Sequence, residues 1–246
     1  MTLVNSTFDT LGMTFDPTMA LLNHSCTPNA AVVFDHNIAS VRSIRPISAD
    51  EQITISYIDN TFKRAIRRQQ LRDQYYFECH CEGCEPSTGT FTDRDLWICE
   101  HCKGRIPEPL LKGDFTCPQC KKIQTTSLQT LRTLEAKAMM QLDLENSTTM
   151  SIENLLNQQL LPTLQSLTSN PSWPVLRQPA PALRYQIYLT CLSTGNLEAA
   201  FHHINTLITS PLIDIHPEPF HPLRTVKIFL MGTLLASLAA ESNSMD

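Results

Sequence analysis

The chain has 246 residues, enough for one large domain or two modest ones with a buried core each. Its 19 basic and 24 acidic residues give a formal net charge of -5. This charge provides no overall attraction to a phosphate backbone, so no direct nucleic-acid partner is expected. Residues 1–22 contain no Lys or Arg and no apolar core of a secretory signal, so we expect a cytoplasmic or nuclear chain.

Residues 1–60 are predicted to form short strands and loops. Three segments are rich in β-branched or apolar residues and are bounded by Asn, Asp, Pro or Ser, namely 30–34, 39–44 and 52–57. This part of the chain is therefore expected to be mostly β.

A helical pattern follows at residues 61–76, and it carries the basic cluster Lys63, Arg64, Arg67 and Arg68. Such a cluster is most often a solvated helix face. The alternative is a patch for nuclear import or for an acidic partner.

The cysteines indicate bound metal. Cys191 stands apart in an apolar helical pattern and is predicted to be a small core residue. Tight Cys-x-Cys and Cys-x-x-Cys spacing in an intracellular chain favours metal over disulfides, because cytosolic thiols are kept reduced. The other eight of the nine cysteines lie at positions 26, 79, 81, 84, 99, 102, 117 and 120.

The pairs Cys99-x-x-Cys102 and Cys117-x-x-Cys120 are separated by 14 residues, a spacing close to that of zinc ribbons. Four thiolates complete a tetrahedral shell and leave no open position, so a structural zinc ion is predicted. His101 is expected to be a bystander. Because acidic residues are mixed with the basic ones around this ribbon, a structural role is favoured over a nucleic-acid role.

The group Cys79-x-Cys81-x-x-Cys84 supplies only three thiolates, one fewer than a closed zinc shell needs. A fourth ligand must come from elsewhere in the chain. His80, His24 and Cys26 are the candidates, and spacing alone does not choose among them.

After Thr126 the pattern becomes helical, and helical hairpins joined by short loops suggest a bundle or a tetratricopeptide-like array. Such an array is a candidate site for a partner peptide. The most apolar stretch, 228–240, is shorter than the roughly 20 residues that cross a bilayer, so a buried helix and no membrane span are expected. Asn, Pro, Gly and Ser breakers bound the predicted helices at 127–144, 151–168, 181–193, 197–209 and 222–242.

Three ordered motifs resemble those of SET-domain protein-lysine methyltransferases. The segment 23–29, Asn-His-Ser-Cys-Thr-Pro-Asn, resembles the family's Asn-His-Ser-Cys-x-Pro-Asn motif, and 50–59 resembles the strand that ends in the catalytic tyrosine. The segment 77–84 resembles the post-SET zinc motif. With Arg-Arg-x-x-Leu-x-Asp-x-Tyr at 67–75 and the helices after the zinc motif, the combination is similar to the SET and MYND domain, or SMYD-type, methyltransferases.

The resemblance implies an α+β fold in three parts. Residues 1–60 would be the C-terminal half of a β-rich SET domain, and 61–125 would hold the post-SET helix, the post-SET zinc site and the zinc ribbon. Residues 126–246 would form an all-α, helical-hairpin, tetratricopeptide-like domain. In this family the cysteine of the Asn-His-Ser-Cys motif is the fourth post-SET zinc ligand, which favours Cys26 as the partner of the other three.

The resemblance also implies S-adenosylmethionine as the cofactor. Asn23 and His24 match positions that hold it, Leu22 lies alongside them, and Phe77 matches the aromatic residue that packs on the adenine. Asn5 resembles a further asparagine that contacts the cofactor. Tyr57 matches the catalytic tyrosine, which belongs to the same set because its hydroxyl faces the transferred methyl group and the lysine nitrogen.

The implied function is methylation of a lysine side chain in a histone or another protein. In the family, a glycine-rich cofactor loop, the first SET strands and a MYND finger precede these motifs. We therefore expect the chain to be the C-terminal portion of such an enzyme and to be weak or inactive alone. The alternative is a zinc-stabilised protein-interaction module with a degenerate SET segment.

Overall fold

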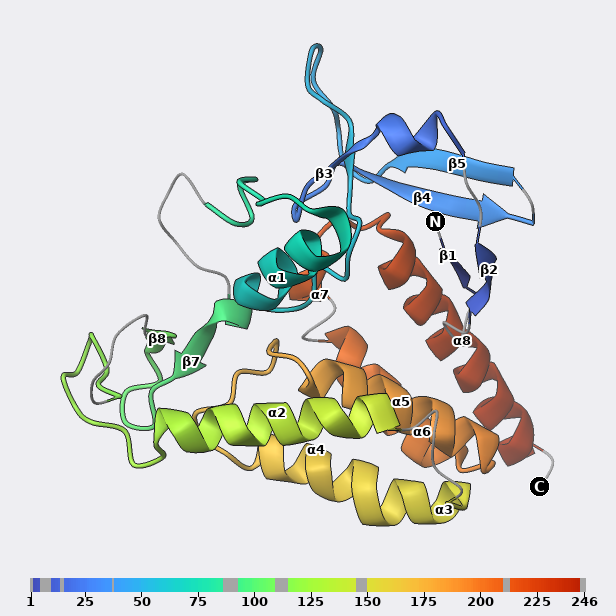
Figure 1. Cartoon of the computed structure of the whole chain (residues 1–246). Helices are drawn as coiled ribbons and strands as arrows, with labels where there is room; N and C mark the ends of the chain where they lie inside the picture. Colours follow the sequence, from blue (N-terminus) through green and yellow to red (C-terminus); the bar gives the residue numbers. More distant parts are fainter. Residues whose placement is uncertain are drawn as a thin grey trace. The chain divides into compact units, whose positions relative to one another are not determined.

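The computed structural model describes residues 2–4, 10–13, 16–36, 38–85, 93–108, 115–144, 150–209 and 213–243. The chain forms two compact units, and each is described by itself. The first comprises residues 1–90 and 216–230, and the second comprises 91–215 and 231–246. Figure 1 shows the elements coloured along the sequence. The predicted division at residues 60 and 125 stays a prediction.

Strands of the first unit pair two by two. The pairings β1–β2 and β4–β5 are antiparallel, and β3–β6 is parallel. The predicted strand at 52–57 is shorter than expected, because the backbone N–H of Tyr57 binds the His24 side chain in place of a neighbouring strand. The elements are β1 (Thr2–Val4), β2 (Thr10–Met13), η1 (Met19–Leu21), β3 (Asn23–His24), β4 (Ala30–Asp35), β5 (Ile38–Ser43), β6 (Thr54–Ile55) and α1 (Arg64–Tyr75).

A buried asparagine ties the loop after β3 to the approach of β6. The amide of Asn29 donates to Oε1 of Glu51 and to the carbonyl of Gln52, both at 2.9 Å. Its carbonyl oxygen accepts from the backbone N–H of Thr54 at 2.9 Å. Because each polar atom of this buried amide is paired, the contact fixes the two segments that carry the site.

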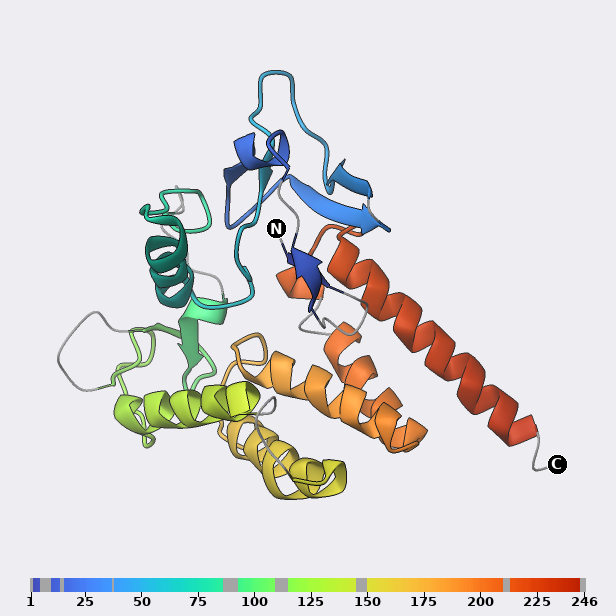
Figure 2. The same cartoon turned by 45° about the vertical axis from the view of Figure 1, so that its right-hand side comes forward.

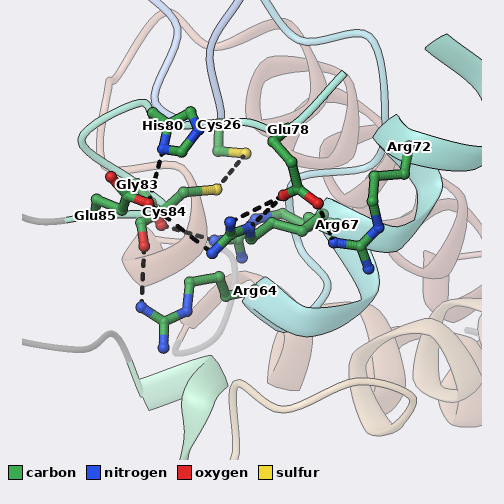
Figure 3. Close-up of polar contacts among 10 residues, drawn as sticks. Cys26, Arg64, Arg67, Arg72, Glu78, His80, Gly83, Cys84 and Glu85 are labelled. Atoms are coloured by element: carbon green, nitrogen blue, oxygen red, sulfur yellow. Dashed lines mark hydrogen bonds and ion pairs between the residues drawn. The ribbon is translucent and has the colours of Figure 1, made fainter. Parts of the chain in front are cut away.

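Both interpretations of the basic cluster on α1 are wrong for its central member. Arg67 is 1% exposed, and its guanidinium donates to the carbonyls of Phe62 and, at 2.9 Å, Gly83. Arg64 donates to the carbonyl of Cys84 at 2.9 Å. Figure 3 shows these arginines reaching from α1 to the loop that carries the post-SET cysteines. The cluster therefore braces this loop.

The next turn of α1 continues this brace at the surface. Arg68 pairs with Glu78 at 2.9 Å, and Arg72 pairs with the other oxygen of Glu78 at 2.5 Å. These hydrogen-bonded ion pairs lower the pKa of the Glu78 carboxyl, with Arg72 the larger cause. Exposed pairs of this kind contribute little stability each.

The second unit begins with a ribbon hairpin of β7 (Leu96–Ile98) and β8 (Arg105–Pro107). Trp97 is fully buried, and the guanidinium of Arg177 lies 3.7 Å from the centre of its ring. Arg177 is itself 1% exposed and pairs with Glu135 at 2.9 Å and with Glu108 at 2.6 Å. Two carboxylates and an aromatic face thus compensate one buried cation.

Helices follow the ribbon in the second unit. Helices α5 and α6 run side by side in both views (Figures 1 and 2). The turn between them follows the predicted break, since Gly195 has a positive φ of 74° and Asn196 caps α6 by accepting from Ala199. Cys191 is buried in α5, as expected. The helices of this unit are α2 (Leu128–Leu144), α3 (Ile152–Asn154), the π-helical turn η4 (Leu155–Leu160), α4 (Leu161–Thr168), α5 (Ala180–Ser193), α6 (Leu197–Leu207) and α7 (Ile213–Ile215). Helix α8 (Pro222–Asn243) has its residues 222–230 in the first unit and the rest in the second.

The prediction that residues 228–240 form a buried helix is wrong about the burial. Helix α8 extends from Pro222 to Asn243, and only 6% of its most apolar window, Pro222–Ala240, is buried. Phe229 and Leu235 are 67% and 44% exposed. By length and composition alone this helix could cross a membrane, which is weak support for a span. The expectation of no membrane span stays a prediction.

Because His203 is buried, we expect the free energy of unfolding to depend on pH. His203 lies in α6, and burial, with smaller effects of His202 and Arg184, lowers its pKa to about 4. The unfolded chain binds a proton near pH 6.5 and the folded chain only near pH 4, so stability falls as the pH drops through this window. We expect His203→Leu to remove about 2 kcal/mol of the loss in unfolding free energy between pH 7 and pH 5. Denaturant titrations at both pH values measure it, and the exposed neighbour variant His202→Leu should behave like the parent.

Candidate functional site

The parallel pair β3–β6 brings the first two motifs together. Asn23 lies opposite Thr54 and His24 opposite Ile55, and the backbone N–H of Ser25 continues the ladder to Ile55 at 2.9 Å. The segment after β6 therefore passes beside His24. Residues that are about 33 positions apart in sequence, such as His24 and Tyr57, become neighbours in this way.

His24 connects the strand end to the cysteine cluster. Its Nδ1 accepts from the backbone N–H of Tyr57 at 3.0 Å, so the ring proton of the neutral form is on Nε2. Nε2 lies 3.3 Å from Sγ of Cys26 and donates to it. Burial lowers the pKa of His24, against a raising effect of Cys81, and this favours the neutral ring. A ring that donates to a metal-binding sulfur orients the ligand.

Tyr57 is held at three points. Its backbone N–H binds His24, its hydroxyl donates to the carbonyl of Leu22, and its own carbonyl accepts from the hydroxyl of Tyr75 at 3.1 Å. Burial raises the pKa of the Tyr57 phenol, with a smaller effect of Tyr75, so the hydroxyl stays protonated at neutral pH. The phenol oxygen keeps lone pairs for a group bound beside it.

Around Tyr57 the structure has a pocket of about 390 Å³. This volume lies within the range of small-molecule and cofactor sites. The rings of Tyr57 and Tyr75 are 4.9 Å apart, and those of His24 and Phe77 are 6.1 Å apart. The lining residues are Asn23, His24, Gln52, Tyr57, Tyr75 and Phe77.

Most of the predicted cofactor residues meet at this pocket. Asn23, His24, Tyr57 and Phe77 line it, and Leu22 reaches the site through its carbonyl. Asn5 lies outside the described residues. The sequence analysis assigned no site role to Tyr75 or Gln52. The position of Tyr75 two residues before Phe77 was the available signal for the former.

The first cysteine cluster joins the segment 23–29 to the segment 77–84. Each of its four sulfur atoms lies within 4.8 Å of the others, and the sulfur atoms of Cys26 and Cys84 are 3.6 Å apart. A tetrahedral site with Zn–S bonds of about 2.3 Å has edges of about 3.8 Å, so the arrangement fits one zinc ion. His24 and His80 are not part of it, and His80 binds Glu85 at 2.9 Å. The cluster consists of Cys26, Cys79, Cys81 and Cys84.

The side chains of Cys26 and Thr27 leave little room for a Cβ at Gly83. A Cβ there would lie 3.0 Å from Cβ of Cys26 and 3.1 Å from Cγ2 of Thr27. The backbone N–H of Cys26 also donates to Sγ of Cys81 at 3.2 Å. The glycine at position 83 therefore allows the loop around Cys26 and the loop that carries Cys81 to approach closely.

The second cysteine cluster lies in the ribbon of the second unit. The sulfur pairs Cys99–Cys120 and Cys102–Cys117 are each 3.7 Å apart, again near the edge of a zinc tetrahedron. His101 is not among the ligands, since its Nε2 lies 3.3 Å from the carbonyl of Ile123. Four sulfur ligands leave no position for a substrate, so this site is structural in character.

Elemental analysis should find two zinc ions per chain. Cys26→Ser should remove the first and Cys102→Ser the second, because each deletes one of four ligands. Cys191→Ser is the matched control and should retain both ions, since Cys191 lies in neither cluster. One ion in the parent, or two in Cys26→Ser, would contradict the assignment.

Comparison with known proteins finds the same family as the motifs. Residues 3–58 match the family model of the SET domain. The chain is 46% identical to "SET domain and MYND-type zinc finger protein 6" of Schizosaccharomyces pombe over 99 residues, which cover 40% of this chain and 20% of that protein. It is 44% identical over 84 residues to mouse "Histone-lysine N-methyltransferase SMYD3", covering 34% of this chain and 20% of the relative.

Human "N-lysine methyltransferase SMYD2" is 40% identical over 74 residues, 30% of this chain and 17% of that protein. The chain thus spans about a fifth of the length of the curated relatives it matches. The resemblance inferred from the three motifs is confirmed by these matches.

Proposed function

We propose that this chain, a SET-domain protein of the SMYD type, contributes to the transfer of a methyl group from S-adenosylmethionine to a lysine side chain of a protein. The observation that carries the proposal is the pocket formed by Asn23, His24, Tyr57 and Phe77 beside a four-cysteine cluster. Relatives of this chain are named as lysine methyltransferases.

The chain's residues suit such a cofactor. Phe77 offers an aromatic face beside the His24 ring, which suits a flat base, and the side chain of Asn23 offers a donor and an acceptor. When bound, S-adenosylmethionine supplies an electrophilic methyl group on a sulfonium. The lysine ammonium would first lose a proton to water, and its neutral nitrogen would then accept the methyl group as the carbon–sulfur bond breaks, leaving S-adenosylhomocysteine and a methylated ammonium.

Tyr57 is proposed as the catalytic residue. Its hydroxyl is anchored on the carbonyl of Leu22, so its oxygen occupies a fixed position at the pocket. A preorganised oxygen can contact the partly positive methyl group as it moves, with no covalent step on the protein. His24 acts as a positioning residue, because it holds the backbone of Tyr57 and reaches Cys26.

Exposure of the pocket supports weak turnover by this chain alone. Tyr75 is 43% exposed, and Asn23 and Gln52 are also exposed. Water then competes with the cofactor and the lysine for these groups, and alignment of the reacting atoms becomes less probable. The substrate class, a histone or another protein, belongs to the same proposal.

Binding of labelled S-adenosylmethionine to the zinc-loaded chain, followed by radiolabelled transfer to core histones and a cell extract, tests the function. We expect saturable binding and slow transfer. A folded chain with two zinc ions and no binding would favour the zinc-stabilised interaction module instead.

Phe77→Ala should weaken S-adenosylmethionine binding about tenfold or more, because a buried aromatic contact is worth about 1–3 kcal/mol. Equilibrium binding measures it directly. Phe229→Ala, on the exposed side of α8, is the matched control and should leave the affinity unchanged. Equal affinities of Phe77→Ala and the parent would remove Phe77 from the cofactor site.

A further inference from the structure

The residue that caps the C-terminus of helix α1, Tyr76, has a backbone conformation that is unfavourable for tyrosine. Tyr76 has φ 60° and ψ 32°, the left-handed conformation, and its N–H caps the helix by donating to the carbonyl of Arg72 at 3.1 Å. Glycine or asparagine usually occupies such a position, since a β-carbon is strained there. A tyrosine is among the less suitable residues for it.

In the described parts of the chain, no contact of the Tyr76 side chain offsets this strain. Tyr76 is 89% exposed, the highest exposure among the large apolar and aromatic residues of the described parts of the chain. Within those parts, its side chain has no hydrogen bond and no ring contact. A residue that breaks a local rule without a stabilising contact is a candidate for a functional contact.

Along the chain, Tyr76 lies between two residues of the pocket. Tyr75 and Phe77, immediately before and after it, both line the pocket that holds Tyr57. One turn earlier on α1, Asp73 is exposed and has no ion pair among the described residues, whereas Arg72 is engaged by Glu78. An exposed aromatic ring and a carboxylate without an ion pair among the described residues thus lie at the C-terminal end of α1, the end at which Tyr75 lines the pocket.

The Tyr76 ring and the Asp73 carboxylate both bind cations. The face of a tyrosine ring binds an ammonium or guanidinium through its quadrupole, and a carboxylate binds either cation directly. We propose that Tyr76, assisted by Asp73, receives a cationic side chain of the protein substrate that flanks the target lysine. The proposal rests on the proposed methyl transfer and adds a basic sequence context to its substrate.

Two synthetic peptides with one central lysine test the proposal, one flanked by arginines and one by glutamines. Binding to the full chain, followed by fluorescence anisotropy, should favour the arginine peptide by about three- to tenfold. Tyr76→Asn should lose this preference, whereas Tyr76→Phe should keep it, because phenylalanine retains the ring face. Asp73→Asn should reduce the preference in part.

The same variants separate this role from a structural one. Tyr76→Asn should raise the midpoint of thermal unfolding by about 2–6 °C, because asparagine tolerates the left-handed conformation. A stabilised Tyr76→Asn protein with an undiminished arginine preference would overturn the proposal. So would a parent without preference, or a Tyr76→Asn variant whose affinity for S-adenosylmethionine falls, since that assigns the ring to the cofactor side.

Failure of the proposed function is a different result. A parent that binds the arginine peptide selectively yet neither binds S-adenosylmethionine nor transfers a methyl group would retain the docking role of Tyr76 and lose the catalytic role of Tyr57.

Discussion

Tyr57→Phe is expected to lower the rate of methyl transfer by about 10²–10³-fold while S-adenosylmethionine affinity stays within about twofold. The hydroxyl that this change removes is the polar group anchored on the carbonyl of Leu22 at the pocket. The ring remains, so its packing against His24 and Tyr75 is kept. Single-turnover transfer of a radiolabelled methyl group and equilibrium cofactor binding measure the two effects.

Tyr75→Phe is the matched control, because it deletes a second hydroxyl of the same pocket. That hydroxyl donates to the backbone carbonyl of Tyr57, and its loss should cost less than about tenfold. Equal rates for the parent and Tyr57→Phe would remove the catalytic role from Tyr57. Equal losses in both variants would indicate a general effect of pocket polarity.

The zinc cluster and the pocket are physically connected in this structure. Cys26 follows His24 by two residues, and the ring of His24 spans from Sγ of Cys26 to the backbone of Tyr57. Phe77 precedes Cys79 by two residues and lines the pocket. A metal that fixes the two cysteines therefore also fixes the two segments that carry pocket residues. The cluster is structural in its coordination and supports the site through geometry.

Sequence patterns with a strict chemical meaning could be interpreted correctly. Two closely spaced Cys-x-x-Cys pairs indicate one shared metal ion, so the ribbon cluster could be predicted from residues 99–120 alone. The helix breaks around Gly195 and Asn196 also follow from local backbone preferences. The fourth ligand of the first cluster required the family resemblance, because Cys26 is more than 50 residues from its partners.

Other features depend on tertiary contacts that local sequence does not encode. Arg67 looks like a member of a solvated basic face, yet it is buried against the carbonyl of Phe62, just before α1, and that of Gly83 in the cysteine loop. Helix α8 is apolar enough for a core, yet its long face is exposed. Gln52 reaches the pocket from the segment just before β6, which pairs with β3, whereas Tyr75 reaches it from the end of α1. In each of these cases the position of the side chain depends on burial and on its hydrogen-bond partners, which composition does not reveal.

Arg67→Met is expected to lower the free energy of unfolding by about 2–5 kcal/mol and to release the first zinc ion more readily. Its guanidinium satisfies the carbonyls of Phe62 and Gly83, and each buried carbonyl left without a donor costs about 1–3 kcal/mol. A zinc ion with four thiolates carries a net charge of about -2, and the positive charge of Arg67 offsets part of it. Methionine keeps much of the buried volume, so the loss of hydrogen bonds and charge dominates.

Arg72→Met is the matched control on the same helix. Arg72 is exposed and pairs with Glu78 at the surface, so its loss should cost less than about 1 kcal/mol and leave the zinc content unchanged. Denaturant unfolding and a chelator competition that records zinc release measure both variants. If Arg67→Met and Arg72→Met lost equal stability and equal zinc, α1 would be a solvated basic helix after all. A selective loss in Arg67→Met would instead establish that one buried arginine holds the post-SET loop, and with it Phe77, in place beside Tyr57.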